Sequence, residues 1–344
     1  MIEVTNLTKK YGNHVAVDHL SFRVEKGQIY GFLGPNGAGK STTMNMITGY
    51  LAATEGTVLI NGHDITKEPE EAKKSIGYLP ELPPLYMDMT VKEYLKFAAE
   101  LKKVPKTERQ KQVVEVMEMT QITDMQGRLI KNLSKGYRQR VGFAQAILGY
   151  PEVIILDEPS VGLDPKQIIE IRDLIRGLSK NHTIILSSHI LSEVSAVCDH
   201  IMIIAHGKLV ASDSPEGLQR RMSSSGDGAS MEVELTVKGS LQEVERAIME
   251  LEEVESVENK GITEENCVKL SVLSKNNVDI RESLFYALAE AKLPIMAMSH
   301  LEKSLEDIFL ELTREQTEMV EPIVVAEGAE KEAETVLNRE KEEE

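Results

Sequence analysis

The feature that most constrains this chain is a glycine-rich octapeptide at residues 34–41, Gly-Pro-Asn-Gly-Ala-Gly-Lys-Ser. It matches the pattern GxxxxGK[ST] and stands between an apolar run, Ile29–Leu33, and a segment with helical periodicity, Ser41–Tyr50. A strand, a glycine-rich turn and a helix in this order form a P-loop, where backbone N–H groups and the helix N-terminus bind phosphate. The sequence therefore predicts a nucleotide-binding α/β core.

The loop also predicts individual roles for its residues. Lys40 is expected to reach the β- and γ-phosphates, and the hydroxyl of Ser41 is expected to ligate Mg²⁺. The full set of predicted nucleotide contacts in this loop is Gly34, Pro35, Asn36, Gly37, Ala38, Gly39, Lys40, Ser41 and Thr42.

Two consecutive carboxylates follow a second apolar run, Val153–Leu156. The carboxyl ends of parallel strands are where α/β proteins bind ligands, so Asp157 and Glu158 are expected beside the P-loop. Asp157 is suited to hold Mg²⁺, and Glu158 is suited to orient or deprotonate an attacking water.

Residues 1–222 alternate short aliphatic runs with helix-like segments, a pattern typical of a largely parallel sheet covered on both faces. Within this part, residues from about 90 to 150 show helical periodicity without a convincing strand, which indicates a helical insert. The Ser/Gly-rich residues 223–230 predict a linker.

After the linker, residues 231–316 show the order strand, helix, strand, strand, helix, strand, with a last helix expected at Ser304–Arg314. This order is the split βαβ pattern of a small α+β, ferredoxin-like domain. Residues 317–344 form an acidic, low-complexity tail that we expect to be disordered.

The sequence at residues 133–140, Leu-Ser-Lys-Gly-Tyr-Arg-Gln-Arg, resembles LSGGQxQR, the signature of the nucleotide-binding domains of ABC transporters. It departs from the signature at Lys135 and Tyr137 and keeps Ser134 and Gly136. The resemblance extends over about residues 1–222. It implies an ATPase that binds ATP and Mg²⁺, in which Ser134 and Gly136 of one subunit complete the site of the other.

Further family elements follow in the expected order. Residues 160–164 resemble the D-loop, with Asp164 at its end; His189 matches the switch histidine that contacts the γ-phosphate; and Tyr11 resembles the aromatic that stacks on adenine. The family usually has Gln at the position of Glu81. A carboxylate also ligates Mg²⁺, so Glu81 is included among the predicted metal ligands with Ser41 and Asp157.

Glu81, the variant signature and the second domain together resemble the ATP-binding subunits of ABC-2-type exporters of the gliding-motility and drug-export kind. That resemblance implies a dimer with a second copy or a paralogous ATPase subunit, acting on integral membrane permease subunits. An importer subunit stays open as an alternative. A non-transport ABC ATPase is disfavoured by the single P-loop and by the spacing of Lys40 and Ser134, and a GTPase or small-molecule kinase by the signature and His189.

Composition bounds the partners and the location. The net charge of −17 argues against nucleic acid, since phosphate backbones bind basic patches. No apolar run approaches the length of about 20 residues that a membrane helix needs. The first residues do not show the basic and then apolar pattern of a signal peptide. Cys198 and Cys267 are far apart, which fits a reducing compartment. We therefore expect a cytoplasmic protein held at the inner face of the cell membrane by its permease.

Overall fold

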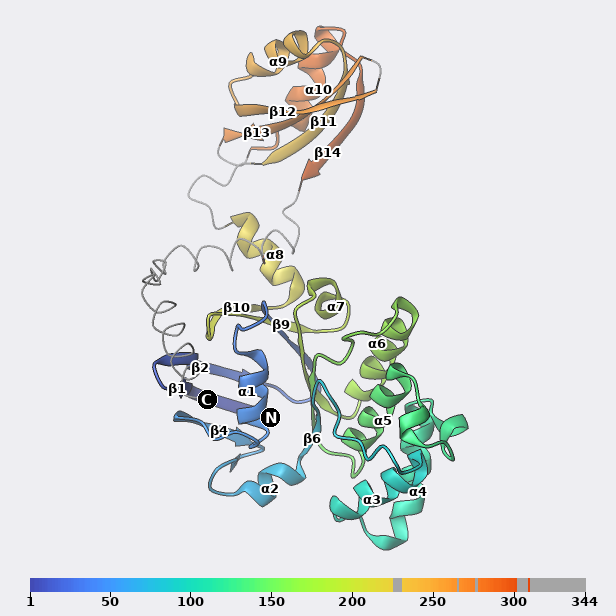
Figure 1. The fold of residues 1–344 in the computed structure, drawn as a ribbon. Coiled ribbons are helices and arrows are strands. Elements are labelled where there is room, and N and C mark those ends of the chain that lie inside the picture. The colour runs from blue at the N-terminus through green and yellow to red at the C-terminus, as the bar shows by residue number, and fades with distance from the viewer. Residues whose placement is uncertain (225–230, 265, 276–277, 302–308, 310–344) are drawn as a thin grey trace, which may run out of the picture.

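The computed structural model describes residues 1–224, 231–264, 266–275, 278–301 and 309. Figure 1 shows a large lower part that contains the N-terminus and a small upper part that follows helix α8. The described strands form three sheets, one of six strands and two of four. No helix among the described residues is both long enough and apolar enough to span a membrane.

A six-stranded sheet is the centre of the large part. In spatial order its strands are β10 (Lys208–Asp213), β9 (His200–Ala205), β3 (Ile29–Leu33), β8 (Thr183–Ser188), β7 (Val153–Asp157) and β6 (Ile76–Leu79). All neighbouring pairs are parallel except the edge pair of β9 and β10. Strands β3, β7 and β8 are buried along their whole length, as expected for a parallel sheet covered on both faces. The predicted α/β core is confirmed.

Alternate residues of these strands enter two hydrophobic cores. Ile154 and Leu156 belong to the larger core, and Val153 and Ile155 belong to the second. The elements of the larger core are helices α6 (Pro165–Ser179), α7 (Leu191–Ser195) and α8 (Pro215–Ser224), together with the helical insert. The second core contains helices α1 (Lys40–Ile47) and α2 (Pro69–Lys74) and an antiparallel sheet.

This antiparallel sheet differs from the largely parallel arrangement that we predicted. Its strands, in spatial order, are β2 (His14–Val24), β1 (Ile2–Tyr11), β4 (Glu55–Ile60) and β5 (His63–Asp64). The register of β1 against β2 shifts three times, and Asn6 and His19 have φ near 50°. Such bulges interrupt the two-residue alternation by which a half-buried strand is recognised in a sequence.

The insert is helical, as predicted. It contains α3 (Val91–Leu101), α4 (Lys106–Met119), short 3₁₀ turns at Thr123–Met125 and Ile130–Asn132, and α5 (Lys135–Ile147). Thr90 starts α3 with a capping box, in which its hydroxyl oxygen accepts from the amide of Glu93 and the Glu93 carboxylate accepts from the amide of Thr90.

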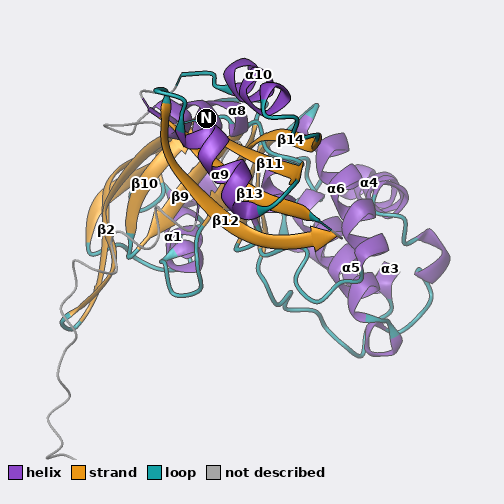
Figure 2. Cartoon of the chain, turned by 90° about the horizontal axis from the view of Figure 1, so that it is seen from above, coloured by secondary structure: helices purple, strands orange, loops and turns teal. Residues whose placement is uncertain are grey.

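The small part has the predicted βαββαβ order. Its elements are β11 (Glu232–Lys238), α9 (Leu241–Met249), β12 (Val254–Glu264), β13 (Cys267–Ser274), α10 (Arg281–Glu290) and β14 (Ile295–Leu301). The sheet order β12-β13-β11-β14 is antiparallel throughout, and Figure 2 shows β12 as a long curved edge strand. Val244 and Leu284 pack from the two helices into the core beneath the sheet. The ferredoxin-like fold is confirmed.

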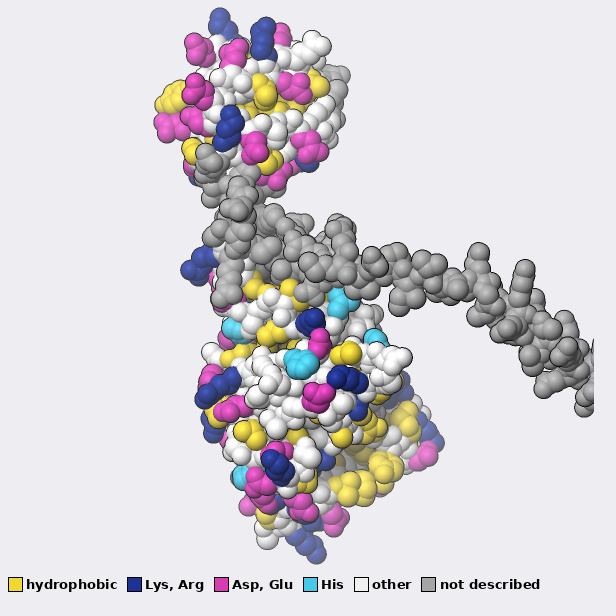
Figure 3. Space-filling view, turned by 90° about the vertical axis from the view of Figure 1, so that its left-hand side faces the viewer, with side chains coloured by type: hydrophobic (Ala, Val, Ile, Leu, Met, Phe, Trp, Pro, Cys, Tyr) yellow, Lys and Arg dark blue, Asp and Glu magenta, His cyan; other side chains and the backbone are white. Residues whose placement is uncertain are grey.

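Between the two parts, α8 continues to Ser224, two residues into the predicted linker. Residues 225–230, most of the expected last helix and the acidic tail lie outside the described residues. Phe309 is described, and it packs against the larger core of the first part. On the face drawn in Figure 3, acidic and basic side chains are interspersed over both parts.

Candidate functional site

The P-loop connects β3 to α1, and its backbone has the shape that glycine allows. Gly39 has φ 100°, and a Cβ there would lie 2.5 Å from the carbonyl oxygen of Ala16. Gly37 has φ 81°, and a Cβ there would meet no atom within 4 Å. Other residues rarely adopt these dihedrals. The loop is therefore packed tightly on one side and open on the other.

Lys40 is the first residue of α1, and its side chain is buried. Its ammonium donates to the carbonyl oxygens of Gly34 at 2.8 Å and Pro35 at 3.2 Å, and it lies 3.4 Å from Oε1 of Glu158. A buried ammonium needs such partners because an unpaired charge away from water is very costly. The contact with Glu158 joins two motifs that are far apart in the chain.

Asp157 ends β7, beside the start of α1. Its Oδ1 accepts a hydrogen bond from the hydroxyl of Ser187 at 2.6 Å and from that of Ser41 at 3.2 Å. Burial raises the pKa of the Asp157 carboxyl above its usual value, and the two hydroxyls and Lys40 oppose that rise. A buried carboxylate with a raised pKa marks a candidate functional position.

The oxygens of Asp157 and Ser41 fit a magnesium ion. Two neighbouring ligands of octahedral Mg²⁺, each at about 2.1 Å, lie about 3 Å apart, and these oxygens are 3.2 Å apart. Among the described residues there is no cluster of three or more His, Cys, Asp or Glu arranged for a metal. Protein sites hold Mg²⁺ through one or two carboxylates plus waters and phosphates, so the test of fit rests on the two oxygens of Asp157 and Ser41.

Glu158 follows Asp157 with φ 46°, an uncommon conformation for a residue other than glycine. Its amide donates to the hydroxyl of Ser187 at 2.9 Å, which helps to hold this turn. Its Oε2 lies 3.0 Å from Nδ1 of His189. The structure thus brings Lys40, Glu158 and His189 together, and backbone strain of this kind concentrates at functional sites.

A cavity of about 470 Å³ opens at these residues. It is lined by Tyr11, His14, Ala16, Asn36, Gly37, Gly39, Lys40, Ser41, Thr42, Glu81, Glu158, Val161 and His189. Tyr11 is half exposed, as a ring available for stacking must be. Four predicted residues do not line the cavity: Gly34, Pro35, Ala38 and Asp157. Gly34 and Pro35 instead hold Lys40, and Ala38 is buried in the second core.

Sequence reasoning missed three of the lining residues, His14, Ala16 and Val161. His14 pairs with Tyr11 across the turn between β1 and β2. A recognised hairpin would have placed His14 beside Tyr11, because directly opposite residues of an antiparallel pair are neighbours. Val161 lies within the segment 160–164 that resembles the D-loop, although no contact was predicted for it, and nothing in the sequence marked Ala16.

Three other predicted residues lie outside this cavity. Ser134 is the N-cap of α5 and accepts from the amide of Tyr137 at 3.4 Å. Gly136 lies in the first turn of α5, where a Cβ would come within 2.9 Å of the side chain of Gln167. Asp164 is the N-cap of α6 and accepts from the amide of Gln167 at 2.9 Å. The signature and the P-loop of one chain therefore do not form one pocket.

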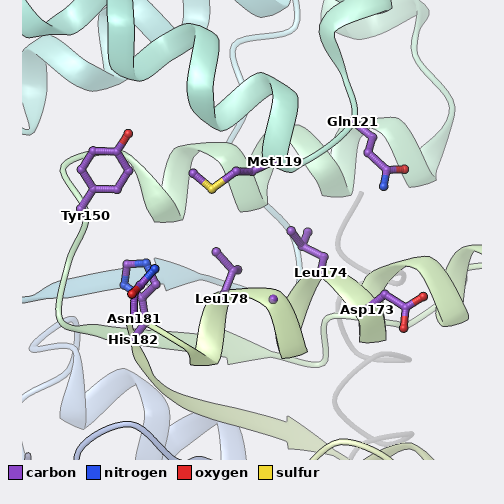
Figure 4. Close-up of a pocket in the computed structure, with 9 residues that line it drawn as sticks. Met119, Gln121, Tyr150, Asp173, Leu174, Leu178, Asn181 and His182 are labelled. Carbon is purple, nitrogen blue, oxygen red and sulfur yellow. The ribbon is translucent and has the colours of Figure 1, made fainter.

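A second cavity, of about 560 Å³, lies between the end of α4, Tyr150 and α6 (Figure 4). The buried ring of His182 lines it, with Nδ1 hydrogen-bonded to the carbonyl oxygen of Pro151 at 2.6 Å. None of the predicted site residues lines this cavity.

Comparison with known proteins finds a match of residues 17–161 to the family described as ABC transporter. The bacitracin transport ATP-binding protein BcrA of Bacillus licheniformis is 42% identical over 223 residues, covering 64% of this chain and 72% of that protein. The linearmycin resistance ATP-binding protein LnrL of Bacillus subtilis (strain 168) is 32% identical over 314 residues, covering 91% and 98%.

A similar solved structure is that of a dimeric ATP-binding cassette in a post-hydrolysis state, bound to ADP and Pi. It is 25% identical to this chain, with a TM-score of 0.57, and the match covers 62% of this chain and 98% of that one. The matched length is similar to that of residues 1–222, the region before the predicted linker.

Proposed function

This chain belongs to the ABC transporter family, as an ATP-binding subunit that hydrolyses ATP, and from that premise we propose that it powers export through a separate membrane permease. One relative is named for bacitracin transport and another for linearmycin resistance. Export is the direction of transport that these similarities support best.

The observation that carries the ATPase part of the proposal, a nucleotide site shared by two subunits, is the separation of the signature from the P-loop cavity. Ser134 and Gly136 lie at the start of α5 and do not line the cavity that holds Lys40. We infer that two subunits face each other and that Ser134 of one completes the site of the other. The matched cassette with ADP and Pi is dimeric, which supports this arrangement.

Within each site the residues of this chain divide the work. Lys40 binds the phosphates, and Asp157 with Ser41, and with Glu81 at the cavity wall, would hold Mg²⁺. That ion supplies charge neutralisation at the phosphates when bound. Glu158 accepts the proton of the attacking water, and His189 orients Glu158 and contacts the γ-phosphate. Tyr11 stacks on the adenine, and Asp164 belongs to the turn through which the two sites communicate.

A group of exposed apolar side chains just after Glu81 is suited to bind the permease. Leu82 is 79% exposed, Tyr86 55% and Met87 39%. The ring of Tyr86 rests on Phe97 of α3 in an edge-to-face contact, with centroids 5.4 Å apart. Exposed apolar groups of this kind mark interaction surfaces. We propose that this surface docks on integral membrane permease subunits and that the chain lies on the cytoplasmic side of the membrane.

The domains have separate roles in this proposal. Residues 1–222 form the ABC ATPase domain, residues 223–230 the linker, and residues 231–316 a domain that regulates or stabilises the dimer. Every predicted nucleotide contact precedes the linker, so the second domain is not required for ATP binding itself. Residues 317–344 form an acidic tail to which we assign no role in ATP binding.

A complementation experiment tests the shared site. Lys40→Ala removes a phosphate contact, and Ser134→Arg blocks the surface offered to the partner. Each variant alone should hydrolyse ATP slowly. A mixture should recover activity, because mixed dimers contain one site that is intact on both sides. If the mixture stays inactive at every ratio while mixed dimers are detected, each site is contained in one chain.

The direction of transport is tested in inside-out vesicles that contain this chain and its copurified permease. Bacitracin, added as a probe to the ATPase side, should stimulate ATP hydrolysis if export is correct and the compound is accepted. Stimulation by a compound presented only from the vesicle lumen would indicate import instead.

A further inference from the structure

Lys135, one of the two signature residues that depart from the family pattern, contacts a turn that belongs to a different motif. It is the first residue of α5, directly after Ser134. Its side chain lies against the backbone of Gly162, in the turn of residues 158–164 that leads from Glu158 to Asp164. A Cβ at Gly162 would collide with the ammonium and lie 3.0 Å from Cε and 3.4 Å from Cδ of Lys135.

The same turn is fixed to α5 at a second point. The side-chain amide of Gln139 donates to the carbonyl oxygen of Pro159 at 3.1 Å, and this hydrogen bond is buried. Within the turn, the amides of Val161 and Leu163 donate back to the carbonyls of Glu158 and Ser160. Gln139 thus anchors the start of the turn, whereas Lys135 holds its exposed middle, where Gly162 has φ 71°.

The two contacts differ in how easily they are broken. The Gln139 side chain is buried and bonded to a carbonyl. Lys135 is exposed, and its ammonium has no hydrogen bond or ion pair with any residue that the structure describes. Nearby Lys131, by contrast, is paired with Asp88 at 2.8 Å. An ammonium on a flexible stem without a carboxylate partner is free to bind an anion that comes close.

We propose that Lys135 is a positioning residue that holds the turn of residues 158–164 against α5 until a nucleotide phosphate reaches Ser134, when its ammonium leaves Gly162 for that phosphate. The inference rests on the proposed function in one respect, that Ser134 faces the nucleotide of the partner subunit. Because Glu158 begins the turn and Asp164 ends it, occupancy of one site then releases the segment that carries the catalytic carboxylate of the other.

Hydrogen exchange tests the first half of the proposal without nucleotide. In the full chain, Lys135→Ala should speed amide exchange of residues 161–163 several-fold, because the side chain that covers the turn is gone. Lys135→Arg should restore slow exchange. Lys166→Ala is the matched control, since Lys166 is an exposed lysine in the first turn of α6, and exchange of the turn should stay as in the parent. Unchanged exchange in Lys135→Ala would overturn the holding role.

ATP-induced dimerisation tests the second half, in a Glu158→Gln background that slows hydrolysis. Lys135→Met keeps the length of the side chain and removes its charge. In Lys135→Met, the ATP concentration for half-maximal dimerisation should rise several-fold, while the affinity of the monomer for a fluorescent ATP analogue stays unchanged. Lys135→Arg should restore the midpoint of the parent. An unchanged midpoint in Lys135→Met overturns the phosphate-binding role. If the Glu158→Gln parent itself does not dimerise with ATP, the proposed function fails. The hydrogen-exchange experiment needs no nucleotide, so it tests the holding role of Lys135 independently of that result.

Discussion

At the scale of single residues, the candidate site places two consecutive carboxylates next to one buried ammonium. Lys40 contacts Glu158, and Asp157 is bonded to the hydroxyls of Ser187 and Ser41 instead. The two carboxylates therefore have different surroundings although they are adjacent in sequence. Different surroundings allow different roles, as when one carboxylate holds a metal and the other accepts a proton.

The role of Glu158 is tested by Glu158→Gln. Loss of a general base lowers turnover by about 10²- to 10⁴-fold, and kcat should fall within this range. ATP binding should persist, because Lys40 keeps its two carbonyl partners, and an ATP-bound dimer should accumulate on size exclusion. Glu152→Gln is the control, since Glu152 is an exposed partner of Lys26. Turnover close to that of the parent in Glu158→Gln would contradict the assignment.

The raised pKa of Asp157 predicts a dependence of stability on pH. Its pKa is higher in the folded than in the unfolded chain, so the folded state binds the proton more tightly and stability falls as pH rises through the interval above the usual value of 3.8. Asn does not ionise, so Asp157→Asn should raise the urea midpoint at pH 7, and the gain should shrink as the pH is lowered towards 3.8.

The matched control for that prediction is Asp88→Asn. A hydrogen bond from Lys131 lowers the pKa of Asp88, which is exposed, so any effect there should be small and of opposite sign. A lower urea midpoint for Asp157→Asn at pH 7, or a difference that does not vary with pH, would contradict the explanation by burial.

At the scale of elements, helix starts determine where the functional groups lie. Helix α1 begins at Lys40, α5 follows its cap Ser134, and α6 follows its cap Asp164. Side-chain caps satisfy backbone amides that have no partner within the helix. Ser134 and Asp164 thus have a structural role in this chain besides the one proposed in the dimer, and substitutions there will affect both folding and turnover.

The start of α3 offers an element-scale test that avoids the site. Thr90→Ala removes the hydroxyl that accepts from the amide of Glu93. We expect a loss of about 1 kcal/mol in the free energy of unfolding, the typical cost of deleting a cap, measured by urea unfolding. Thr90→Ser keeps the hydroxyl and should lose far less. Equal losses in both variants would show that the methyl group, and not the cap, stabilises this start.

At the scale of the whole molecule, the two parts have separate cores, and two features connect them. Helix α8 extends from the first part, with Leu218 buried in the larger core, and Phe309 packs against that same core after the chain has completed the small sheet. The chain therefore leaves the ATPase domain and contacts it again.

Truncation tests whether the first part folds and binds ATP without the second part. A fragment of residues 1–224 ends with α8 and should fold and bind a fluorescent ATP analogue with the affinity of the full chain. Its melting temperature should be somewhat lower, because the Phe309 contact is lost. A chain ending at Arg314 keeps Phe309 and should melt like the full chain. An unfolded 1–224 fragment would mean that the second domain belongs to the ATPase core.

Much of this protein follows from short stretches of its sequence. The P-loop, the strand that ends in Asp157 and the βαββαβ order were predicted because each signal lies within a few residues that form one local structure. The antiparallel sheet was not predicted, because the bulges in β1 and β2 remove the local alternation that would have shown it. The residue roles at the site stay predictions until the variants above are assayed.

The sequence by itself determined which groups are candidates for the nucleotide site: a lysine at a helix start, two carboxylates at a strand end and a serine cap. Only the tertiary structure decided which of them meet. It brought Glu158 into contact with both Lys40 and His189, placed Ser134 outside their cavity, and packed Lys135 against Gly162. Contacts between residues far apart in the chain depend on how sheets and helices pack, and local patterns do not encode that packing.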